Sequence, residues 1–313
     1  MPISELRSYR PPLTKTKRFK AFWDENLELA EEQPLNSSWR EIRPFTESVR
    51  VSKLTFDGFL DKSPIEGFLL RGPRADSKSP ILLHFHGYGG NKGRITDFLG
   101  WVHLGFSVLA VDVRGQSGES ADRGTYKPGY VKGHMTKGIE SEDTYYYRYV
   151  FMDCYRAVKC VLEKSDLDPS KLGVMGSSQG GGLSIVTAAL NKEVSFLISG
   201  VPYLCNFERA VNMATVGPYL EILDYLREHP SEEGHVFRIL SYFDAMNLAP
   251  LVKVPALVSV GLLDTICPPS TVFATYNHIA SRDKELAVYP GVAHEDTGLH
   301  TERKMEWAVK QSI

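Results

Sequence analysis

Two adjacent serines, Ser177 and Ser178, lie in the stretch GSSQGG at residues 176–181. A serine hydroxyl is a weak nucleophile until a neighbouring base takes its proton. One arrangement that activates it is the G-x-S-x-G elbow, a strained turn that exposes the serine between a strand and a helix. The apolar run LGVMG precedes these serines, and the helical pattern GGLSIVTAALNK follows them. The stretch therefore has the context that a nucleophile elbow requires.

The spacing of glycines decides between the two serines. The elbow crowds the positions two residues before and two residues after its serine, and glycine relieves that crowding because it has no Cβ. Gly176 and Gly180 occupy those positions around Ser178. The other serine would have Met175 and Gln179 there. We predict that Ser178 is the nucleophile and that the other serine is only its neighbour.

A base for Ser178 is expected among the histidines that follow it, because the chain order in this kind of site is serine, acid, histidine. His294 comes just after the run ELAVYPG, in the loop where the last strand should deliver a base. His300 is predicted to be solvent-exposed on the next helix and is the fallback. The other downstream histidines lie in an inserted region or inside a helical pattern: His229, His235 and His278. We predict that His294 is the base.

The acid that orients the histidine is expected at the carboxyl end of another late strand. Asp264 meets this expectation, since it follows the run ALVSVGL. Asp296 is too close to His294 along the chain, and Asp244 belongs to the inserted region. Taken alone, Asp264 could also cap the helix that begins at the prolines after it. Together with the serine and the histidine, it completes a predicted catalytic triad.

Acyl transfer also needs hydrogen-bond donors aimed at the oxyanion that develops in the transition state. In the elbow, one donor is the backbone N–H of the residue after the nucleophile, here Gln179. The loop HGYGG at residues 86–90 follows an apolar run and parallels the HGGG-type loop of esterases. We predict the Tyr88 N–H as the second donor, and expect His86 to brace the loop by hydrogen bonds.

Composition limits the partners of the chain. A formal net charge of −2 over 313 residues gives no electrostatic reason to expect nucleic acid or an anionic membrane as a partner. No apolar run approaches the ~20 residues of a membrane-spanning helix, and the first 20 residues lack the apolar core of a secretory signal. We therefore expect a cytoplasmic protein.

The sequence gives no reason to expect a metal or a cofactor. The pair of histidines in HFH, residues 84–86, lacks the further clustered ligands that a metal site needs. The four cysteines are scattered without CxxC pairing, which is typical of buried or free thiols in a reducing compartment: Cys154, Cys160, Cys205 and Cys267.

Short apolar runs alternate with stretches of helical period along most of the chain. The first two predicted strands resemble an antiparallel hairpin, and the later ones are nearly continuous in apolar residues, as in strands covered on both faces. The predicted strands span residues 49–56, 65–71, 80–87, 106–113, 172–176, 195–201, 256–262 and 285–291. With helices expected at 143–164 and 181–192, the pattern predicts a doubly wound, mostly parallel sheet, an α/β-hydrolase fold.

We expect a single domain over residues 1–313, with two departures from this alternation. Residues 1–45 are expected to form N-terminal helical or extended decoration. Residues 202–254 are too long for a simple crossover, and they are predicted to form an inserted helical cap. Its helical patterns lie near residues 208–214, 219–228 and 236–243.

Three separated motifs resemble the acetyl xylan esterases and cephalosporin-C deacetylases of carbohydrate esterase family 7. They are GSSQGGGL, the RGQ at residues 114–116, and the pair His294–Glu295. The resemblance extends through VPYLCNFERAV, LSYFDAMNLA and GLLDTICPPSTVFATYNH, and so covers nearly the whole chain. The family pattern places the triad and the oxyanion donors on the residues predicted above. One departure is Ser177, where many relatives have glycine.

The resemblance implies removal of acetyl groups from acetylated xylo-oligosaccharides and other small acetyl esters, including cephalosporin C. It also implies a homohexamer, a trimer of dimers with active sites facing an interior cavity. For the RGQ segment we expect a structural role, anchoring loops under the site. The cap is expected to narrow the acyl pocket with some of its large side chains, and Trp101 to add a wall.

Two other classes of protein share parts of this pattern. A serine exopeptidase of the prolyl oligopeptidase type has the same elbow and triad order, but this chain lacks the long propeller of those enzymes. A non-catalytic binder of the same fold would be expected to have a degenerate triad, whereas all three members are present here.

Overall fold

A nine-stranded sheet forms the centre of the computed structural model, which describes residues 1–73, 75, 79–127 and 132–312. The strand order is β1-β2-β3-β5-β4-β6-β7-β8-β9. The strands are β1 Ser38–Ile42, β2 Arg50–Asp57, β3 Pro64–Arg71, β4 Ile81–Phe85, β5 Ser107–Val111, β6 Leu172–Ser177, β7 Val194–Gly200, β8 Ala256–Gly261 and β9 Lys284–Tyr289.

The sheet has an antiparallel part and a parallel part. Strands β1, β2 and β3 form an antiparallel meander, and β3 is also antiparallel to β5. From β5 to β9 every neighbouring pair is parallel. The prediction of a mostly parallel sheet that begins with an antiparallel hairpin is confirmed.

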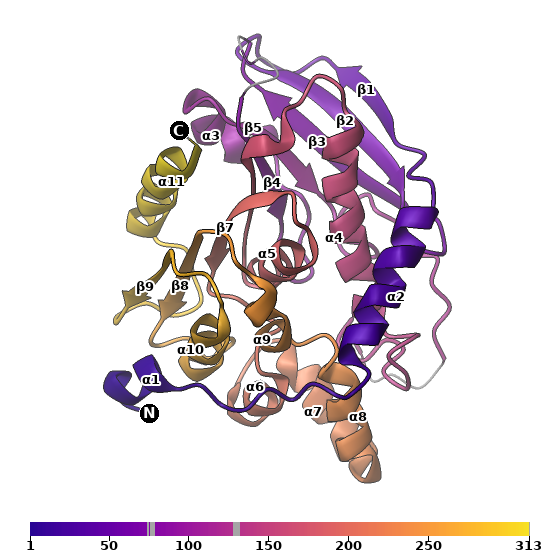
Figure 1. Ribbon diagram of the computed structural model, residues 1–313, viewed down its shortest axis with the longest axis vertical. Coiled ribbons are helices and arrows are strands. Elements are labelled where there is room, and N and C mark those ends of the chain that lie inside the picture. Colours follow the sequence, from indigo (N-terminus) through magenta and orange to yellow (C-terminus); the bar gives the residue numbers. More distant parts are fainter. Residues whose placement is uncertain (74, 76–78, 128–131, 313) are drawn as a thin grey trace.

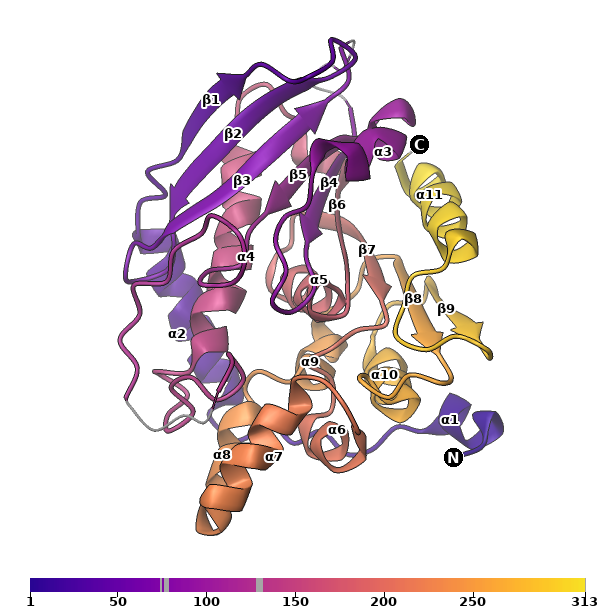
Figure 2. The same ribbon diagram turned by 180° about the vertical axis from the view of Figure 1, so that it is seen from behind.

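Helices cover both faces of the parallel part (Figures 1 and 2). Their bounds are α1 Ile3–Ser8, α2 Phe19–Glu32, α3 Leu99–His103, α4 Tyr146–Glu163, α5 Gln179–Leu190, α6 Phe207–Met213, α7 Tyr219–Glu228, α8 Glu233–Leu240, α9 Ala245–Leu248, α10 Pro269–His278 and α11 Gly298–Ser312. The larger core cluster draws on α2, α4, α5, α10 and the cap helices, and the smaller one on α3 and α11. Since both faces of these strands are buried, their sequences are continuously apolar.

Residues 1–45, which were expected to lie outside the main fold, form part of the sheet, because they include β1 at its edge. Helix α2 lies beside α4 (Figure 1) and buries Phe22 and Trp23. The Phe22 ring packs 4.8 Å from that of Tyr242, and the Trp23 ring 5.8 Å from that of Phe243. These two cap aromatics therefore anchor the N-terminal segment.

Between β7 and β8 the chain forms helices α6, α7, α8 and α9, and α7 and α8 project from one end of the molecule (Figures 1 and 2). The last of the three expected cap helices, near residues 236–243, comes earlier in the chain than expected, because α8 begins at Glu233 and ends at Leu240. Tyr203 and Tyr219 are fully buried, with their ring centroids 4.1 Å apart.

The prediction that Trp101 forms a wall of the acyl pocket receives no support. Trp101 lies on α3 and packs edge-to-face against Phe106, in the core cluster on the α11 side of the sheet. Tyr203 and Tyr219 belong to the cluster on the other side. The sheet itself therefore separates Trp101 from the cap aromatics.

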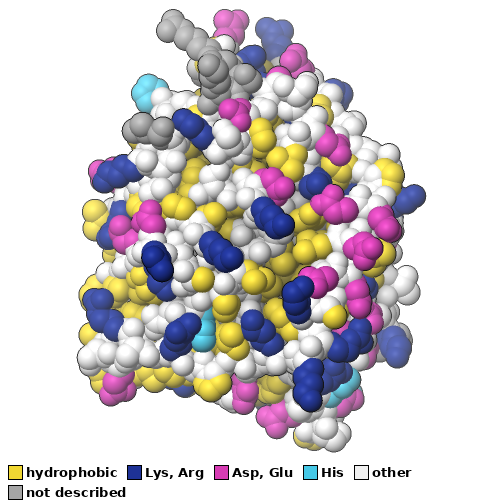
Figure 3. Space-filling view, viewed as in Figure 1, with side chains coloured by type: hydrophobic (Ala, Val, Ile, Leu, Met, Phe, Trp, Pro, Cys, Tyr) yellow, Lys and Arg dark blue, Asp and Glu magenta, His cyan; other side chains and the backbone are white. Residues whose placement is uncertain are grey.

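Charged side chains of both signs share the face in Figure 3, where they lie among apolar ones. In the part of the chain that the structure describes, no helix is both long enough and apolar enough to cross a membrane.

Candidate active site

Ser178 stands between β6 and α5 on a sharp turn, with a backbone φ of 57°. This left-handed conformation is strained for a residue other than glycine. A Cβ on Gly176 would come within 2.5 Å of the Phe85 carbonyl oxygen, and a Cβ on Gly180 within 2.0 Å of the same atom. Because the end of β4 packs so closely against the turn, both positions require glycine, as the spacing predicted.

The turn brings Ser178 to His294, which lies in the loop between β9 and α11. His294 Nε2 is 2.8 Å from Ser178 Oγ, and its Nδ1 is 2.7 Å from Asp264 Oδ2. A carboxylate only accepts, so Nδ1 donates to Asp264 and Nε2 is left to accept the serine proton. The three residues thus have the mutual geometry of a Ser-His-Asp triad.

Asp264 is held in place by the backbone that follows it. Asp264 is only 4% exposed. Its Oδ1 accepts hydrogen bonds from the N–H groups of Ile266, at 2.9 Å, and Cys267, at 2.8 Å. The N-cap residue of α10 is Pro268. Asp264 is therefore not a helix cap, and its second oxygen is free to hold His294.

The prediction that His300 is solvent-exposed is wrong. The residue is 2% exposed, and its Nδ1 lies 3.0 Å from the Tyr289 hydroxyl. Burial lowers the pKa of His300 to about 4. The His300 Nε2 lies 3.9 Å from Asp296 and does not face Ser178. His300 is therefore not positioned to act as the base.

The loop after β4 lies beside Ser178. A Cβ on Gly87 would be 3.9 Å from the Ser178 Cβ. His86 is 5% exposed; its Nε2 accepts the Val113 N–H at 2.9 Å, and its Nδ1 is 2.7 Å from the Gly87 carbonyl oxygen. Burial lowers the pKa of His86, which favours this neutral, hydrogen-bonded form. His86 braces the loop as expected.

The two predicted oxyanion donors are Gln179, the first residue of α5, and Tyr88, in the loop after β4. Among the backbone hydrogen bonds between described residues, neither of their N–H groups has a partner. The Gln179 side chain is fully buried and pairs with the Gln116 amide, at 2.9 and 3.1 Å. Gln116 also accepts the Gly89 N–H at 2.8 Å, so one amide ties the elbow to the loop of Tyr88.

The expected structural role of the RGQ segment agrees with these contacts. Arg114 is fully buried and forms ion pairs with Asp153 at 2.6 Å and Asp61 at 2.8 Å. It thereby fixes the backbone from which Gln116 reaches the site.

A cap residue that sequence reasoning missed, Glu221 on α7, holds the Tyr88 side chain. The Tyr88 hydroxyl donates to the Glu221 carboxylate at 2.8 Å and accepts the His134 N–H at 2.6 Å. Glu221 also accepts the Met135 N–H at 3.0 Å. A Cβ on Gly133 would come within 2.1 Å of the Glu221 carboxylate, so this loop folds tightly around the acid.

Glu221 is only 9% exposed, and burial raises its pKa. Burial likewise raises the pKa of the Tyr88 hydroxyl. The Tyr88 ring packs 6.2 Å from the Tyr203 ring, and the Tyr203 N–H donates to the Ser178 carbonyl oxygen at 2.9 Å. The cap therefore holds the Tyr88 side chain through Glu221 and bonds the Ser178 backbone through Tyr203.

Within the described residues, one group has the geometry to hold a metal ion: Asp264, Cys267 and His294, whose ligand atoms lie within 4.8 Å of one another. Two of the three already bond to each other in the triad geometry. Burial raises the pKa of the Cys267 thiol well above its usual range, which opposes the thiolate that a metal binds. The donor set fits serine chemistry better than metal chemistry.

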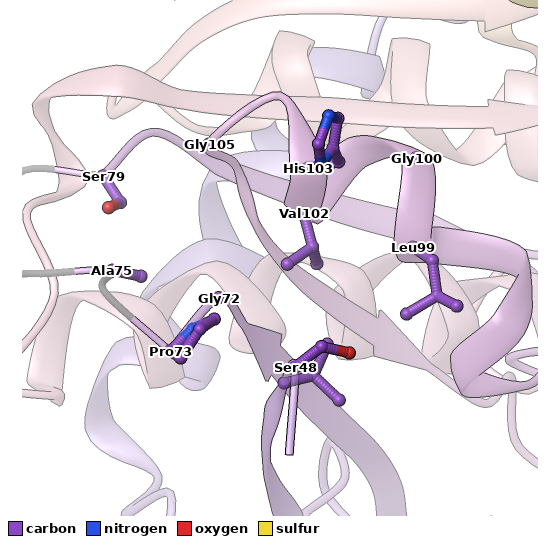
Figure 4. Close-up of a pocket in the computed structure, with 11 residues that line it drawn as sticks. Ser48, Gly72, Pro73, Ala75, Ser79, Leu99, Gly100, Val102, His103 and Gly105 are labelled. Atoms are coloured by element: carbon purple, nitrogen blue, oxygen red, sulfur yellow. The ribbon is translucent and has the colours of Figure 1, made fainter. Parts of the chain in front are cut away.

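Surface hollows also lie outside the triad. A pocket of about 860 Å³ opens between α3 and the ends of β2 and β3, lined in part by Leu99, Val102 and His103 (Figure 4). It includes none of the predicted site residues. A second pocket of about 420 Å³ reaches Gly87 and Ser177 on the α11 side of the elbow.

Comparison with known proteins agrees with this geometry. Residues 1–311 match the acetyl xylan esterase (AXE1) family. An acetyl xylan esterase from Paenibacillus sp. R4 is 38% identical, with a TM-score of 0.95 over 98% of this chain and 99% of that one. Acetyl xylan esterase 1 from Thermoanaerobacterium sp. JW/SL YS485 is 34% identical, with a TM-score of 0.94 over 99% of each chain.

More distant relatives extend the comparison. The acetyl esterase Axe7A of Xylanibacter ruminicola is 28% identical over 96% of this chain and 68% of its own length. The α/β hydrolase GrgF from Penicillium sp. sh18, at 19% identity and a TM-score of 0.58, shares the fold alone. With its α/β-hydrolase fold and a family match over almost its full length, the chain belongs to the acetyl xylan esterase family and is a carboxylic ester hydrolase.

Proposed function

We propose that the chain removes acetyl groups from small acetylated substrates through an acyl-enzyme on Ser178. The observation that carries this proposal is the continuous hydrogen-bonded path from Ser178 Oγ through His294 to Asp264. In the first step, Ser178 attacks the ester carbonyl carbon while His294 takes its proton. The N–H groups of Tyr88 and Gln179 stabilise the negative oxygen.

The second half of the reaction uses the same groups. When the tetrahedral intermediate collapses, the ester C–O bond breaks, and protonated His294 gives its proton to the departing alcohol. Water then attacks the acetyl-enzyme with His294 as base, and acetate leaves as Ser178 recovers its proton. Asp264 orients the imidazole and stabilises its charged form throughout.

As substrates we propose acetylated xylo-oligosaccharides and cephalosporin C, as the family resemblance implies. For the preference for acetyl we propose that the Tyr88 side chain, which the loop after β4 carries near Ser178 and the cap holds through Glu221, limits the space for a longer acyl chain. The alcohol side should be permissive, because an enzyme that accepts both a sugar and a cephem cannot grip the leaving group tightly.

We further propose, on the same resemblance, a cytoplasmic homohexamer built as a trimer of dimers around a cavity that the active sites face. All four cysteines are free and buried, which suits a reducing compartment. If the sites face an enclosed cavity, short acetylated fragments should be deacetylated much faster than polymeric xylan. Equal rates at equal acetyl concentration would contradict the enclosed assembly.

The decisive test of the activity is acetate release from acetylated xylose, xylo-oligosaccharides and cephalosporin C by the wild type and by Ser178→Ala. The variant should lose turnover and labelling by a serine-directed organophosphate. A chelator should not change the wild-type rate. Strong inhibition by the chelator, reversed by added metal, would overturn the serine mechanism.

A further inference from the structure

A hydrogen-bonded contact joins the segment that carries Ser178 to the loop that carries His294. Ser177, the last residue of β6, donates its hydroxyl to Asp296, which lies two residues beyond His294. Lys304 of α11 donates to the same carboxylate oxygen of Asp296 at 2.7 Å. A residue next to Ser178 is thus bonded to a residue two positions after His294.

This contact is partly shielded from water. The Asp296 side chain is 23% exposed and the Lys304 side chain 15% exposed. Burial opposes the ionisation of Asp296, but the Lys304 charge and the hydroxyl of Ser177 outweigh it and lower the pKa of Asp296. The acceptor is therefore a carboxylate, and hydrogen bonds to charged groups are stronger than those between neutral groups.

The neighbouring strand leaves room for the contact. Gly200 of β7 pairs with Ser177 in the sheet. A Cβ at Gly200 would lie 2.6 Å from Ser177 Oγ and 2.9 Å from Asp296 Oδ1. Since real Cβ atoms do not approach other atoms this closely, any residue larger than glycine would push the pair apart.

The loop between β9 and α11 needs such a tie. Most of its residues are exposed, among them Gly291, Ala293 and Glu295. His294 must nevertheless keep both of its ring nitrogens within hydrogen-bond distance of their partners. A displacement of about 1 Å in a catalytic group can cost roughly a hundredfold in rate.

We propose that Ser177, Asp296 and Lys304 are positioning residues that hold His294 against Ser178. The inference rests on the proposed role of His294 as the base. It gives the Ser177 hydroxyl a task of its own. The two serines of the elbow then have different parts: Ser178 is the nucleophile, and Ser177 aligns the base.

The test compares kcat and KM for a small acetyl ester in Ser177→Ala, Asp296→Ala and the double variant. Ser177→Ala should lower kcat about tenfold with KM nearly unchanged, because one charge-assisted hydrogen bond is lost. Asp296→Ala also loses the contact with Lys304, so it should lower kcat at least as much. The double variant should be no slower than the slower single variant, since both changes break the same contact. Asp296→Asn keeps an acceptor for Ser177 and should recover part of the loss.

Arg303→Met is the matched control. Arg303 lies on α11, as Lys304 does, and the variant removes only its exposed ion pair with Glu285 of β9, so kcat should be unchanged. Thermal unfolding of each variant identifies a change that merely destabilises the fold. If Asp296→Ala does not fold, Ser177→Ala carries the test, because it removes only a hydroxyl.

Wild-type kcat in both single variants would overturn the proposal, and so would losses that multiply in the double variant. Either result would leave the proposed function intact as long as Ser178→Ala is inactive. An active Ser178→Ala would instead remove the proposed function itself, so the two failures are distinguishable.

Discussion

The two walls of the active site are built differently. On one side, Asp264 and His294 stand on loops at the ends of β8 and β9, and Asp264 is held by N–H groups two and three residues away. On the other side, Tyr88 is held by Glu221, which lies 133 residues further along the chain on a cap helix. In the first, the triad wall, the orienting acid is held locally, whereas in the second, the acyl wall, the tyrosine is held at long range.

This difference separates chemistry from selectivity. Changes in the triad wall should alter how fast any ester is cleaved, since they act on proton transfer. Changes in the acyl wall should alter which esters are accepted, since they act on the space beside Ser178.

Asp264→Asn should have the largest effect and should act on all esters alike. The amide favours the wrong histidine tautomer, and the equivalent change in a well-studied triad lowers kcat about 10⁴-fold. The variant should remain folded. Steady-state rates on acetyl and butyryl esters should fall by the same factor; a loss confined to one ester would break the division between the walls.

Chain length of the acyl group should have the next largest effect. On the proposed preference for acetyl, a longer acyl group must displace the Tyr88 side chain, and overpacking of this kind costs ~1–3 kcal/mol. That cost corresponds to a drop of roughly five- to two-hundred-fold from acetyl to longer acyl esters. A series of esters with one alcohol measures it, and a preference for octanoate over acetate would contradict the account of the acyl wall.

Glu221→Gln should have a smaller effect and lower kcat on acetyl esters about tenfold, because the Tyr88 hydroxyl then bonds to a neutral amide in place of a carboxylate. Because the Tyr88 ring is then held less firmly, the ratio of acetyl to butyryl activity should fall. Asp224→Asn is the matched control, since Asp224 lies on the same helix in an exposed ion pair with Arg227. An unchanged ratio in Glu221→Gln would show that the cap does not set acyl length.

The sequence allowed the triad wall to be predicted because its signals are local. Gly176 and Gly180 identified Ser178, and the ends of two apolar runs identified Asp264 and His294. The parallel strands were equally readable, because burial on both faces makes them apolar throughout.

The acyl wall could not be predicted in the same way. Glu221 lies on an amphipathic helix, where a buried acid has the same spacing as a solvated one.

Contacts outside this wall were equally hidden in the sequence. Ser177 and Asp296 meet only because β6 and the loop after β9 end at the same edge of the sheet. His300 was predicted to be exposed because a polar residue near a helix start usually is, yet α11 turns it inward onto Tyr289.

Acid should weaken the fold through the buried histidines. Burial lowers the pKa of His300 to about 4 and that of His84 to about 3, whereas both titrate near 6.5 when unfolded. Their stabilising contribution is present above pH 6.5 and is lost as the pH falls toward the folded-state values. Urea unfolding between pH 7 and pH 4 should show this decline, and His300→Phe should make it shallower. An equal slope in the variant would rule out His300 as a contributor.

The central claim is that Ser178, and not Ser177, carries the acyl group, and rapid quenching tests it most directly. Wild-type enzyme mixed with an activated acetyl ester is quenched in acid within its first turnovers and digested. The peptide that spans both serines is then sequenced by mass spectrometry. The account predicts one acetyl group, located on Ser178 and absent in Ser178→Ala. An acetyl group on Ser177, or turnover that continues in Ser178→Ala, would contradict it.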